Sequence, residues 1–178
     1  MAQNTCIFAG GCFWCTEAAF EQLKGVKSVE SGYIGGDAGT ANYEAVCTGR
    51  TGHAEAIRIT YDPAEISYDR LLDVFFDAHD PTTLNRQGAD VGTQYRSAIF
   101  TSDPTEIEAA RAKIADLTEG RKFATPIMTT IEPATAFYPA EDYHQDFAAQ
   151  NPNHPYIRGV SYPKVCKVRK QHADLIDS

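Results

Sequence analysis

The sequence contains no apolar run long enough to cross a membrane. A transmembrane helix needs about 18 or more apolar residues in succession, and polar or charged residues interrupt every hydrophobic segment of the 178-residue chain before that length. The N-terminus also lacks the basic region and long apolar region of a secretory signal peptide. We therefore expect a cytoplasmic protein with no membrane as partner.

Positive charge is scarce. The 16 Lys and Arg residues are outnumbered by 24 Asp and Glu residues, for a formal net charge of −8. Such a field repels polyanions and argues against nucleic acid as a partner. A short basic cluster near the C-terminus is best interpreted as a solvated helix face; it consists of Lys164, Lys167, Arg169 and Lys170.

Cysteine is also limited, to five residues, and no export signal accompanies them. In a reducing compartment we expect catalytic, redox-cycling or core thiols rather than structural disulfides. A structural zinc site usually has four ligands. The chain offers a single Cys-x-x-Cys pair and five histidines without tight ligand spacing. We therefore expect neither a metal nor another cofactor.

The composition suits one domain. With 43% hydrophobic and 11% aromatic residues, the chain can bury a core without metals or disulfides. No internal repeat, low-complexity segment or linker divides it. We expect one catalytic domain over residues 1–178 and a monomer.

Apolar periodicity predicts the order strand, helix, strand, strand, helix, strand in the first hundred residues. The segments are 6–9, about 13–23, 26–33, 56–61, 67–76 and 97–101, with polar loops at 37–53 and 80–92. This is the split βαβ order of a ferredoxin-like two-layer sandwich. We expect an α+β fold, with helices on one side of a mixed sheet and C-terminal extensions.

Residues near several helix starts support these segments. Ser67 is a candidate N-cap. Asp103-Pro104-Thr105-Glu106 combines a cap, a proline at the first helical position and a capping-box glutamate. It predicts a further helix that reaches about Leu117, followed by a strand at 127–131.

The segment Gly10-Gly11-Cys12-Phe13-Trp14-Cys15 is the chemical centre of the sequence. The strand-to-helix turn places Cys12 at a helix N-terminus, where unpaired N–H groups and the helix dipole favour negative charge. We expect its thiol to ionise more readily than a free one, and the thiolate is the nucleophile. Cys15 lies three residues on, so the two sulfurs can face the same side of the helix start.

Three other interpretations of this motif remain open from the residues alone. It could belong to a zinc site, although no second ligand pair is present. It could be a thioredoxin-type dithiol, although two bulky aromatic residues separate the cysteines. It could also be a pair of core thiols beside a core tryptophan.

An ordered series of further motifs accompanies this segment, and the chain resembles the A-type peptide methionine sulfoxide reductases over about residues 5 to 155. The motifs are Gly10-Gly11-Cys12-Phe13-Trp14, Tyr43-Glu44, Thr51-Gly52-His53-Ala54-Glu55, His79-Asp80-Pro81-Thr82, Asn85-Arg86-Gln87-Gly88, Asp90, Gly92-Thr93-Gln94-Tyr95-Arg96-Ser97, Phe137-Tyr138 and Ala140-Glu141-Asp142-Tyr143-His144-Gln145.

The resemblance implies reduction of the S epimer of free and protein-bound methionine sulfoxide. It assigns Cys12 as the nucleophile and Glu55 as the acid, which must be protonated at neutral pH and therefore lie in an apolar site. It assigns Phe13 and Trp14 as the apolar wall that receives the substrate methyl group.

The resemblance also implies the polar side of the site. Tyr43 and Tyr95 match hydroxyls that hydrogen-bond the sulfoxide oxygen, and Asp90 matches a carboxylate that orders this side. Asp142 and His144 belong to the series too, but we expect them to cap or pin the last helix.

A Cys12 sulfenic acid would then condense with a second thiol, and thioredoxin or a similar dithiol would reduce the disulfide. Many family members have glycine in place of Cys15 and carry recycling cysteines in a glycine-rich tail, whereas residues 161–170 here look helical. Cys15 is our first choice as the resolving thiol. Cys166 is the alternative, for resolving or recycling. We expect Cys6 to be structural and Cys47 structural or incidental.

Two other classes of function compete with the reductase. A general dithiol–disulfide exchanger would need no acid, so Glu55 and the tyrosines argue against it. A non-catalytic module could bind methionine-rich or sulfoxide-bearing peptides through the aromatic pair, and a reactive Cys12 would argue against that.

Overall fold

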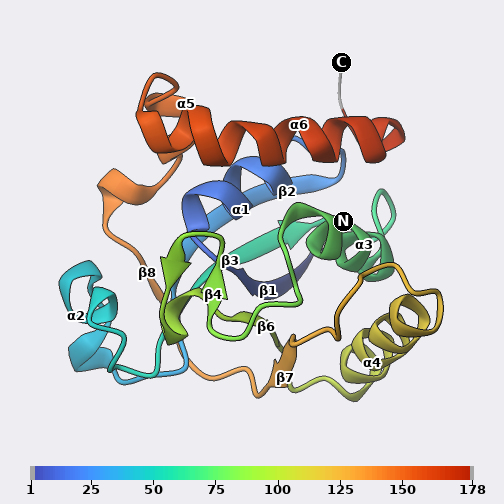
Figure 1. Cartoon of the computed structure of the whole chain (residues 1–178), viewed down its shortest axis with the longest axis horizontal. Coiled ribbons are helices and arrows are strands. Elements are labelled where there is room, and N and C mark those ends of the chain that lie inside the picture. The colour runs from blue at the N-terminus through green and yellow to red at the C-terminus, as the bar shows by residue number, and fades with distance from the viewer. Residues whose placement is uncertain (1–2, 177–178) are drawn as a thin grey trace.

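The computed structural model describes residues 3–176. A six-stranded sheet has the order β7-β6-β1-β3-β2-β8 (Figure 1). Its strands are β1 (Asn4–Gly10), β2 (Val26–Ile34), β3 (Ala54–Tyr61), β6 (Ser97–Phe100), β7 (Thr130–Glu132) and β8 (Phe137–Pro139). β7 is parallel to β6 and the other neighbours are antiparallel, so the sheet is mixed. A short hairpin of β4 (Arg86–Gln87) and β5 (Asp90–Val91) forms a separate sheet.

Helices connect and cover the sheet. The α-helices are α1 (Phe13–Glu21), α2 (Tyr43–Cys47), α3 (Tyr68–Ala78), α4 (Pro104–Glu119), α5 (Phe147–Gln150) and α6 (Tyr162–Gln171). Turns of 3-10 helix occupy Ala38–Thr40, Thr93–Tyr95, Asp142–His144 and Ala173–Leu175, and a π-helical turn at Ile157–Ser161 leads into α6. Within residues 3–176, no helix has the length and apolar character needed to span a membrane.

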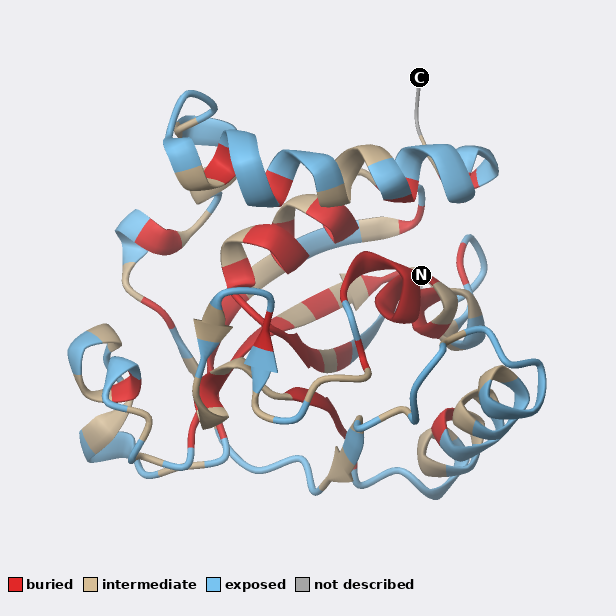
Figure 2. Cartoon of the chain, in the orientation of Figure 1, coloured by how far each residue is buried: buried red, intermediate tan, exposed pale blue. Residues whose placement is uncertain are grey.

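The main core lies between one face of the sheet and the helices α1 and α3. The ring of Phe8 on β1 lies 5.8 Å from that of Phe20 on α1 and 4.8 Å from that of Phe75 on α3. Because side chains alternate along a strand, neighbouring Ala9 belongs to a smaller cluster on the other face. Figure 2 shows buried residues along the central strands, α1 and α3. The expected mixed α/β architecture is confirmed.

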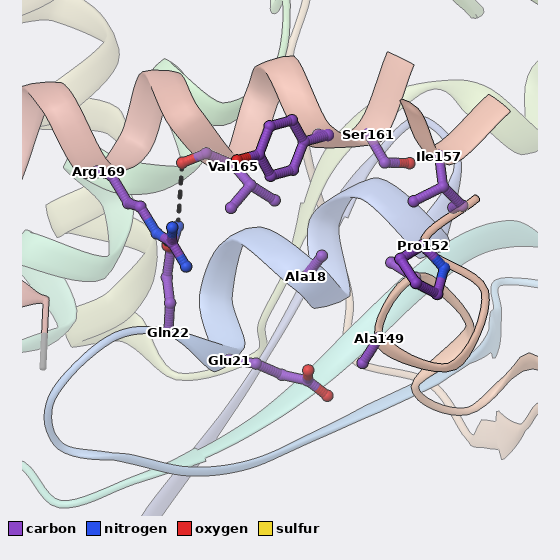
Figure 3. Close-up of a pocket in the computed structure, with 11 residues that line it drawn as sticks. Ala18, Glu21, Gln22, Ala149, Pro152, Ile157, Ser161, Val165 and Arg169 are labelled. Atoms are coloured by element: carbon purple, nitrogen blue, oxygen red, sulfur yellow. Dashed lines mark hydrogen bonds between the residues drawn. The ribbon is translucent and has the colours of Figure 1, made fainter. Parts of the chain in front are cut away.

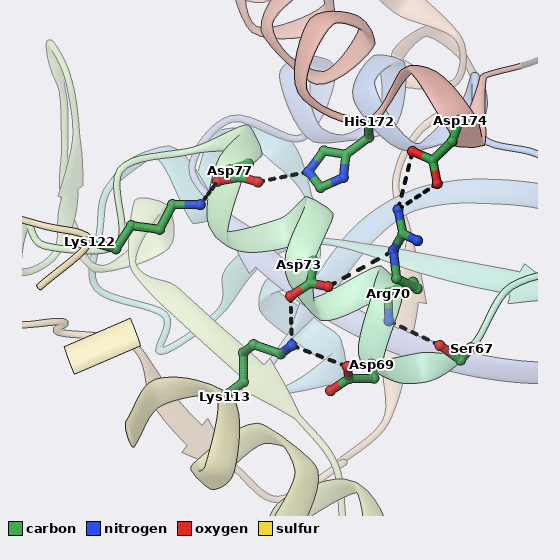
Figure 4. Close-up of polar contacts among 9 residues, drawn as sticks. All are labelled: Ser67, Asp69, Arg70, Asp73, Asp77, Lys113, Lys122, His172 and Asp174. Carbon is green, nitrogen blue, oxygen red and sulfur yellow. Dashed lines mark hydrogen bonds and ion pairs between the residues drawn. The ribbon is translucent and has the colours of Figure 1, made fainter. Parts of the chain in front are cut away.

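The C-terminal extension packs over α1 and ends against α3 (Figure 1). On α6, the Arg169 side chain donates to Gln22 after α1 at 2.9 Å. Past its end, His172 lies 2.7 Å from the carboxylate of Asp77 on α3, which also accepts from Lys122 at 2.5 Å (Figure 4). These contacts fix the layer that lies over the cysteine motif.

Most local predictions hold, with three corrections. Ser67 accepts from the N–H of Arg70, and Asp103 from that of Thr105, as N-caps do. The capping box is wrong, because the Glu106 carboxylate accepts from the Thr101 hydroxyl and not from the cap residue.

The other two corrections concern segment limits. The loop at 37–53 contains the short helix α2. The strand expected at 127–131 is β7 at 130–132, since the N–H of Met128 instead donates to the carbonyl of Pro81.

Candidate active site

Cys12 is the N-cap of α1, at the end of a sharp turn out of β1. Its carbonyl accepts from the N–H of Cys15 at 3.1 Å and of Thr16 at 3.4 Å. Gly11 makes this turn with a φ of +92°, and a Cβ there would lie 2.6 Å from the Gln87 side chain. Only glycine therefore suits this position, and the turn brings the Cys12 sulfur to the wall of a small cavity.

The cavity has a volume of about 140 Å³. Its walls come from α1, α2, β3, β5, the turn at 93–95 and the C-terminal segment. The lining residues are Cys12, Phe13, Trp14, Tyr43, Glu55, Asp90, Tyr95 and Tyr156. The structure thus brings together seven of the residues singled out from the sequence. Tyr156 is the residue that sequence reasoning missed, since it lies just beyond the resemblance.

Glu55, on β3, presents a protonated carboxyl to this cavity. The side chain is 2% exposed, and burial raises its pKa to about 8. The charges of Asp90 and Cys15 raise it further, while a hydrogen bond from the N–H of Phe13, at 3.2 Å, lowers it. Because this pKa exceeds neutral pH, the carboxyl carries a proton that it can donate.

The two thiols of the motif share a proton unequally. Burial raises the pKa of Cys12, and its hydrogen bond to Cys15 raises it further. The same bond lowers the pKa of Cys15 to about 6, with help from the positive charge of Lys164 and the hydroxyl of Ser161. The expectation that Cys12 ionises more readily than a free thiol is wrong for this state. Desolvation outweighs the helix N-terminus, and the negative charge resides on Cys15.

Phenols form the polar side of the cavity. Burial raises the pKa values of Tyr43 and Tyr95, so both hydroxyls stay protonated and can donate hydrogen bonds. The Tyr156 hydroxyl donates to the Asp90 carboxylate at 2.6 Å and lies 3.6 Å from the Cys15 sulfur. Asp90 thereby ties the C-terminal segment to the site.

The aromatic wall is held from behind by residues near α5. The ring of Trp14 stacks on that of Phe147, with centroids 3.8 Å apart, and its N–H donates to Nδ1 of His144 at 3.0 Å. The His144 ring also lies 4.5 Å from that of Tyr43. The expectation that His144 pins the last helix is therefore wrong: it orients the cavity wall. Asp142 is exposed in the turn before it.

Glu17 fixes the turn that carries this support. Its side chain, on α1, is 1% exposed, and its carboxylate accepts from the N–H of Asp146 at 2.8 Å. Asp146 has a φ of +55° and immediately precedes α5. Because α5 and α6 cover α1, the carboxylate is buried and holds the chain behind Trp14.

The other cysteines do not line this cavity, although the Cys47 thiol hydrogen-bonds the hydroxyl of Tyr43. Cys6 is buried in β1, and Cys47 is exposed at the end of α2. Cys166 is half-buried on α6 and does not line the cavity. Across residues 3–176, no histidine, cysteine or carboxylate joins Cys12 and Cys15 in a group with the spacing of metal ligands.

A larger cavity, of about 360 Å³, lies between α1, α5 and α6 (Figure 3). Small and apolar side chains such as Ala18, Pro152 and Val165 form much of its wall, with Glu21 and Arg169 among its charged residues. No cysteine is among its lining residues, so it offers no nucleophilic thiol. The smaller cavity is the candidate active site because it holds one.

Fold and cavity together define a mixed α/β protein with a cysteine-centred site. The chain belongs to the peptide methionine sulfoxide reductase family, whose model matches residues 4–176. It is 56% identical to the peptide methionine sulfoxide reductase MsrA of Deinococcus radiodurans, over 98% of this chain and 85% of the relative.

Solved structures agree with this assignment. Reduced Mxr1 from Saccharomyces cerevisiae superposes with a TM-score of 0.80 at 34% identity, over 85% of this chain and 87% of the other. Mxr1 in complex with Trx2 superposes with a TM-score of 0.57 at 24% identity, over 82% and 85% of the two chains.

Proposed function

We propose that the chain is a thiol-dependent reductase that converts the S epimer of free and protein-bound methionine sulfoxide to methionine. One observation carries the proposal: the Cys12 thiol, the protonated Glu55 carboxyl and two phenols line the same small aromatic cavity. The relatives named above are peptide methionine sulfoxide reductases.

Substrate binding follows from the chemistry of the walls. The methyl group packs against Phe13 and Trp14, while the sulfoxide oxygen accepts hydrogen bonds from Tyr43, Tyr95 and Glu55. The apolar wall fixes the methyl group on one side of the chiral sulfur, and the donors fix the oxygen on the other. The sulfur can therefore bind in one configuration only. The opposite epimer would exchange methyl and oxygen, so the site selects one epimer.

In the first step, the Cys15 thiolate takes the Cys12 proton through their hydrogen bond, and the Cys12 sulfur attacks the sulfoxide sulfur. Glu55 protonates the oxygen. The hydroxyl ends on Cys12 as a sulfenic acid and the thioether leaves as methionine. The methionine sulfur is reduced and the Cys12 sulfur is oxidised, so electrons balance.

In the second step, the Cys15 sulfur attacks the sulfenic sulfur of Cys12, forms a disulfide and releases water. We propose thioredoxin as the reductant of this disulfide, supported by the crystal structure of Mxr1 in complex with Trx2, a thioredoxin. Cys166 is the alternative thiol: it would resolve the sulfenic acid itself or take the disulfide over from Cys15.

Incubation with racemic methionine sulfoxide and a dithiol tests the proposal. We expect consumption to stop at one half, with the S epimer gone, and Cys12→Ser to form no methionine. Equal loss of both epimers, or turnover by Cys12→Ser, would contradict it. Reduction of insulin-like disulfides without sulfoxide turnover would instead indicate a general dithiol exchanger, and binding without turnover a peptide-binding module.

We further propose that residues 1–178 form one domain, of which residues 1, 2, 177 and 178 lie outside the described part. The strand order β6-β1-β3-β2, with α1 and α3 on one face, supports assignment to the ferredoxin-like split βαβ class. Limited proteolysis that leaves one resistant core spanning these elements would support both assignments. We propose a cytoplasmic location, because a reducing compartment supplies the dithiol that would return the cycling cysteines to their thiol form.

A further inference from the structure

The Cys15 sulfur lies against a second buried polar group. Ser161 Oγ is 3.0 Å from Cys15 Sγ, and both side chains are buried. Ser161 is the last residue of the π-helical turn, directly before α6. Residues 146 positions apart in the sequence therefore meet in the interior, at the sulfur that the proposed mechanism uses twice.

Only one of the two hydroxyls near this sulfur is free to donate to it. The Tyr156 hydroxyl, at 3.6 Å, has a single proton and donates it to the Asp90 carboxylate. The Ser161 hydroxyl has Cys15 as its partner in the described part of the chain. A thiolate accepts hydrogen bonds and cannot donate them, so Ser161 is the donor whenever Cys15 is ionised.

We propose that Ser161 is a positioning residue for disulfide formation, whose hydroxyl holds the Cys15 sulfur as a nucleophile beside Cys12. This inference rests on the proposed function and deepens it. Cys15 gives an electron pair to the sulfenic sulfur of Cys12, the S–O bond breaks, and the hydroxide leaves as water with the proton that Cys15 took from Cys12 in the first step. The low pKa of Cys15 is consistent with such a donor.

The Ser161→Ala variant of the full chain tests this role. Ser161→Thr, which keeps a hydroxyl, serves as the conservative variant. Ser31→Ala is the matched control, because Ser31 on β2 is also fully buried and takes no part in the described hydrogen bonds of the Cys15 sulfur. Each reduced protein receives one equivalent of methionine sulfoxide without reductant. Three readouts follow: the final yield of methionine, the rate of disulfide formation, and the Cys12 sulfenic acid trapped by dimedone.

A fourth readout separates positioning from packing. The rate of Cys15 alkylation against pH, followed by peptide mass spectrometry, reports ionisation of that thiol. Well below pH 6, where most of Cys15 is protonated, loss of a hydrogen bond to the thiolate should slow disulfide formation about tenfold. It should also raise the alkylation midpoint by about one pH unit. Trapped sulfenic acid should increase accordingly, while Ser161→Thr and Ser31→Ala should behave as the wild type.

Disulfide formation at the wild-type rate in Ser161→Ala, with an unchanged alkylation midpoint, would overturn the inference. Should Ser161→Ala not fold, a folded Ser161→Thr that resolves slowly would overturn it as well. The methionine yield keeps the two proposals distinct. Failure of the proposed function removes methionine formation from the wild type, whereas failure of this inference leaves that yield intact.

Discussion

Replacement of Glu55 by glutamine tests the role of the acidic proton while it leaves the shape of the side chain unchanged. Glutamine keeps the shape and an oxygen that can accept from the N–H of Phe13, but it carries no acidic proton. Proton transfer by a positioned acid contributes about 10²- to 10⁴-fold to a rate. We therefore expect the single-turnover rate of methionine formation to fall by that factor in Glu55→Gln.

The same change should also raise the free energy of unfolding relative to the wild type, by an amount that grows as the pH increases. An unfolded glutamate has a pKa near 4.3, whereas burial raises that of Glu55 to about 8. Between these values the folded state binds more protons than the unfolded state, so wild-type stability falls with increasing pH. At about 1.36 kcal/mol per pH unit, the loss reaches roughly 4 kcal/mol at pH 7 as an upper figure. Glutamine does not titrate, so the Glu55→Gln variant does not lose this stability.

Urea denaturation of both proteins between pH 5 and pH 8 measures this difference. The slope with pH is the diagnostic quantity, since any packing change adds a constant offset. Glu132→Gln is the control: burial raises the pKa of Glu132, but hydrogen bonds from Arg96 and Thr130 outweigh it and hold the pKa below its ordinary value. The difference in stability between that variant and the wild type should not change with pH. A flat difference for Glu55→Gln would refute the assignment of a protonated carboxyl.

Other variants test the remaining parts of the molecule. Cys15→Ser should yield one methionine per chain without recycling by thioredoxin, whereas Cys166→Ser should turn over normally; the reverse pattern in steady-state assays would transfer the resolving role to Cys166. Phe147→Ala removes the ring stacked on Trp14 and should raise KM about five- to tenfold with little change in kcat; an unchanged KM would contradict that support. His172→Ala removes a partner of the buried carboxylate at the end of α3 and should destabilise the fold by roughly 1–3 kcal/mol in urea denaturation; an unaltered midpoint would argue against it.

The sequence predicts the elements that form the core because their periodicity is strong. β3 alternates between Ile57 and Ile59 on one side and Arg58 and Thr60 on the other, and α3 has an N-cap and an apolar face. α2 and β8 have five and three residues, too few for a periodic pattern to stand out. Their positions depend on contacts far along the chain: the N–H of Tyr43 donates to Glu141, for example.

The candidate site was predictable where it depends on residue identity, and not where it depends on burial. The ordered motifs predicted that Glu55, Tyr43 and Tyr95 belong to one site, although their separations in the sequence say nothing about the distances between them in space. The supporting residues His144 and Tyr156 acquire their roles only when the C-terminal segment folds over α1. No local pattern encodes that packing, so sequence reasoning interpreted His144 as a helix pin and missed Tyr156.

The protonation of the site follows from the same packing. A helix N-terminus by itself favours an ionised Cys12, but burial removes that advantage and hydrogen bonds stabilise the thiolate of Cys15 instead. The proposed chemistry needs Cys15 ionised and Glu55 protonated at the same moment. With pKa values of about 6 and about 8, both conditions hold together around neutral pH. The packing of the site therefore creates the base and the acid: the Cys15 sulfur accepts a hydrogen bond from Cys12, and burial excludes water from the Glu55 carboxyl.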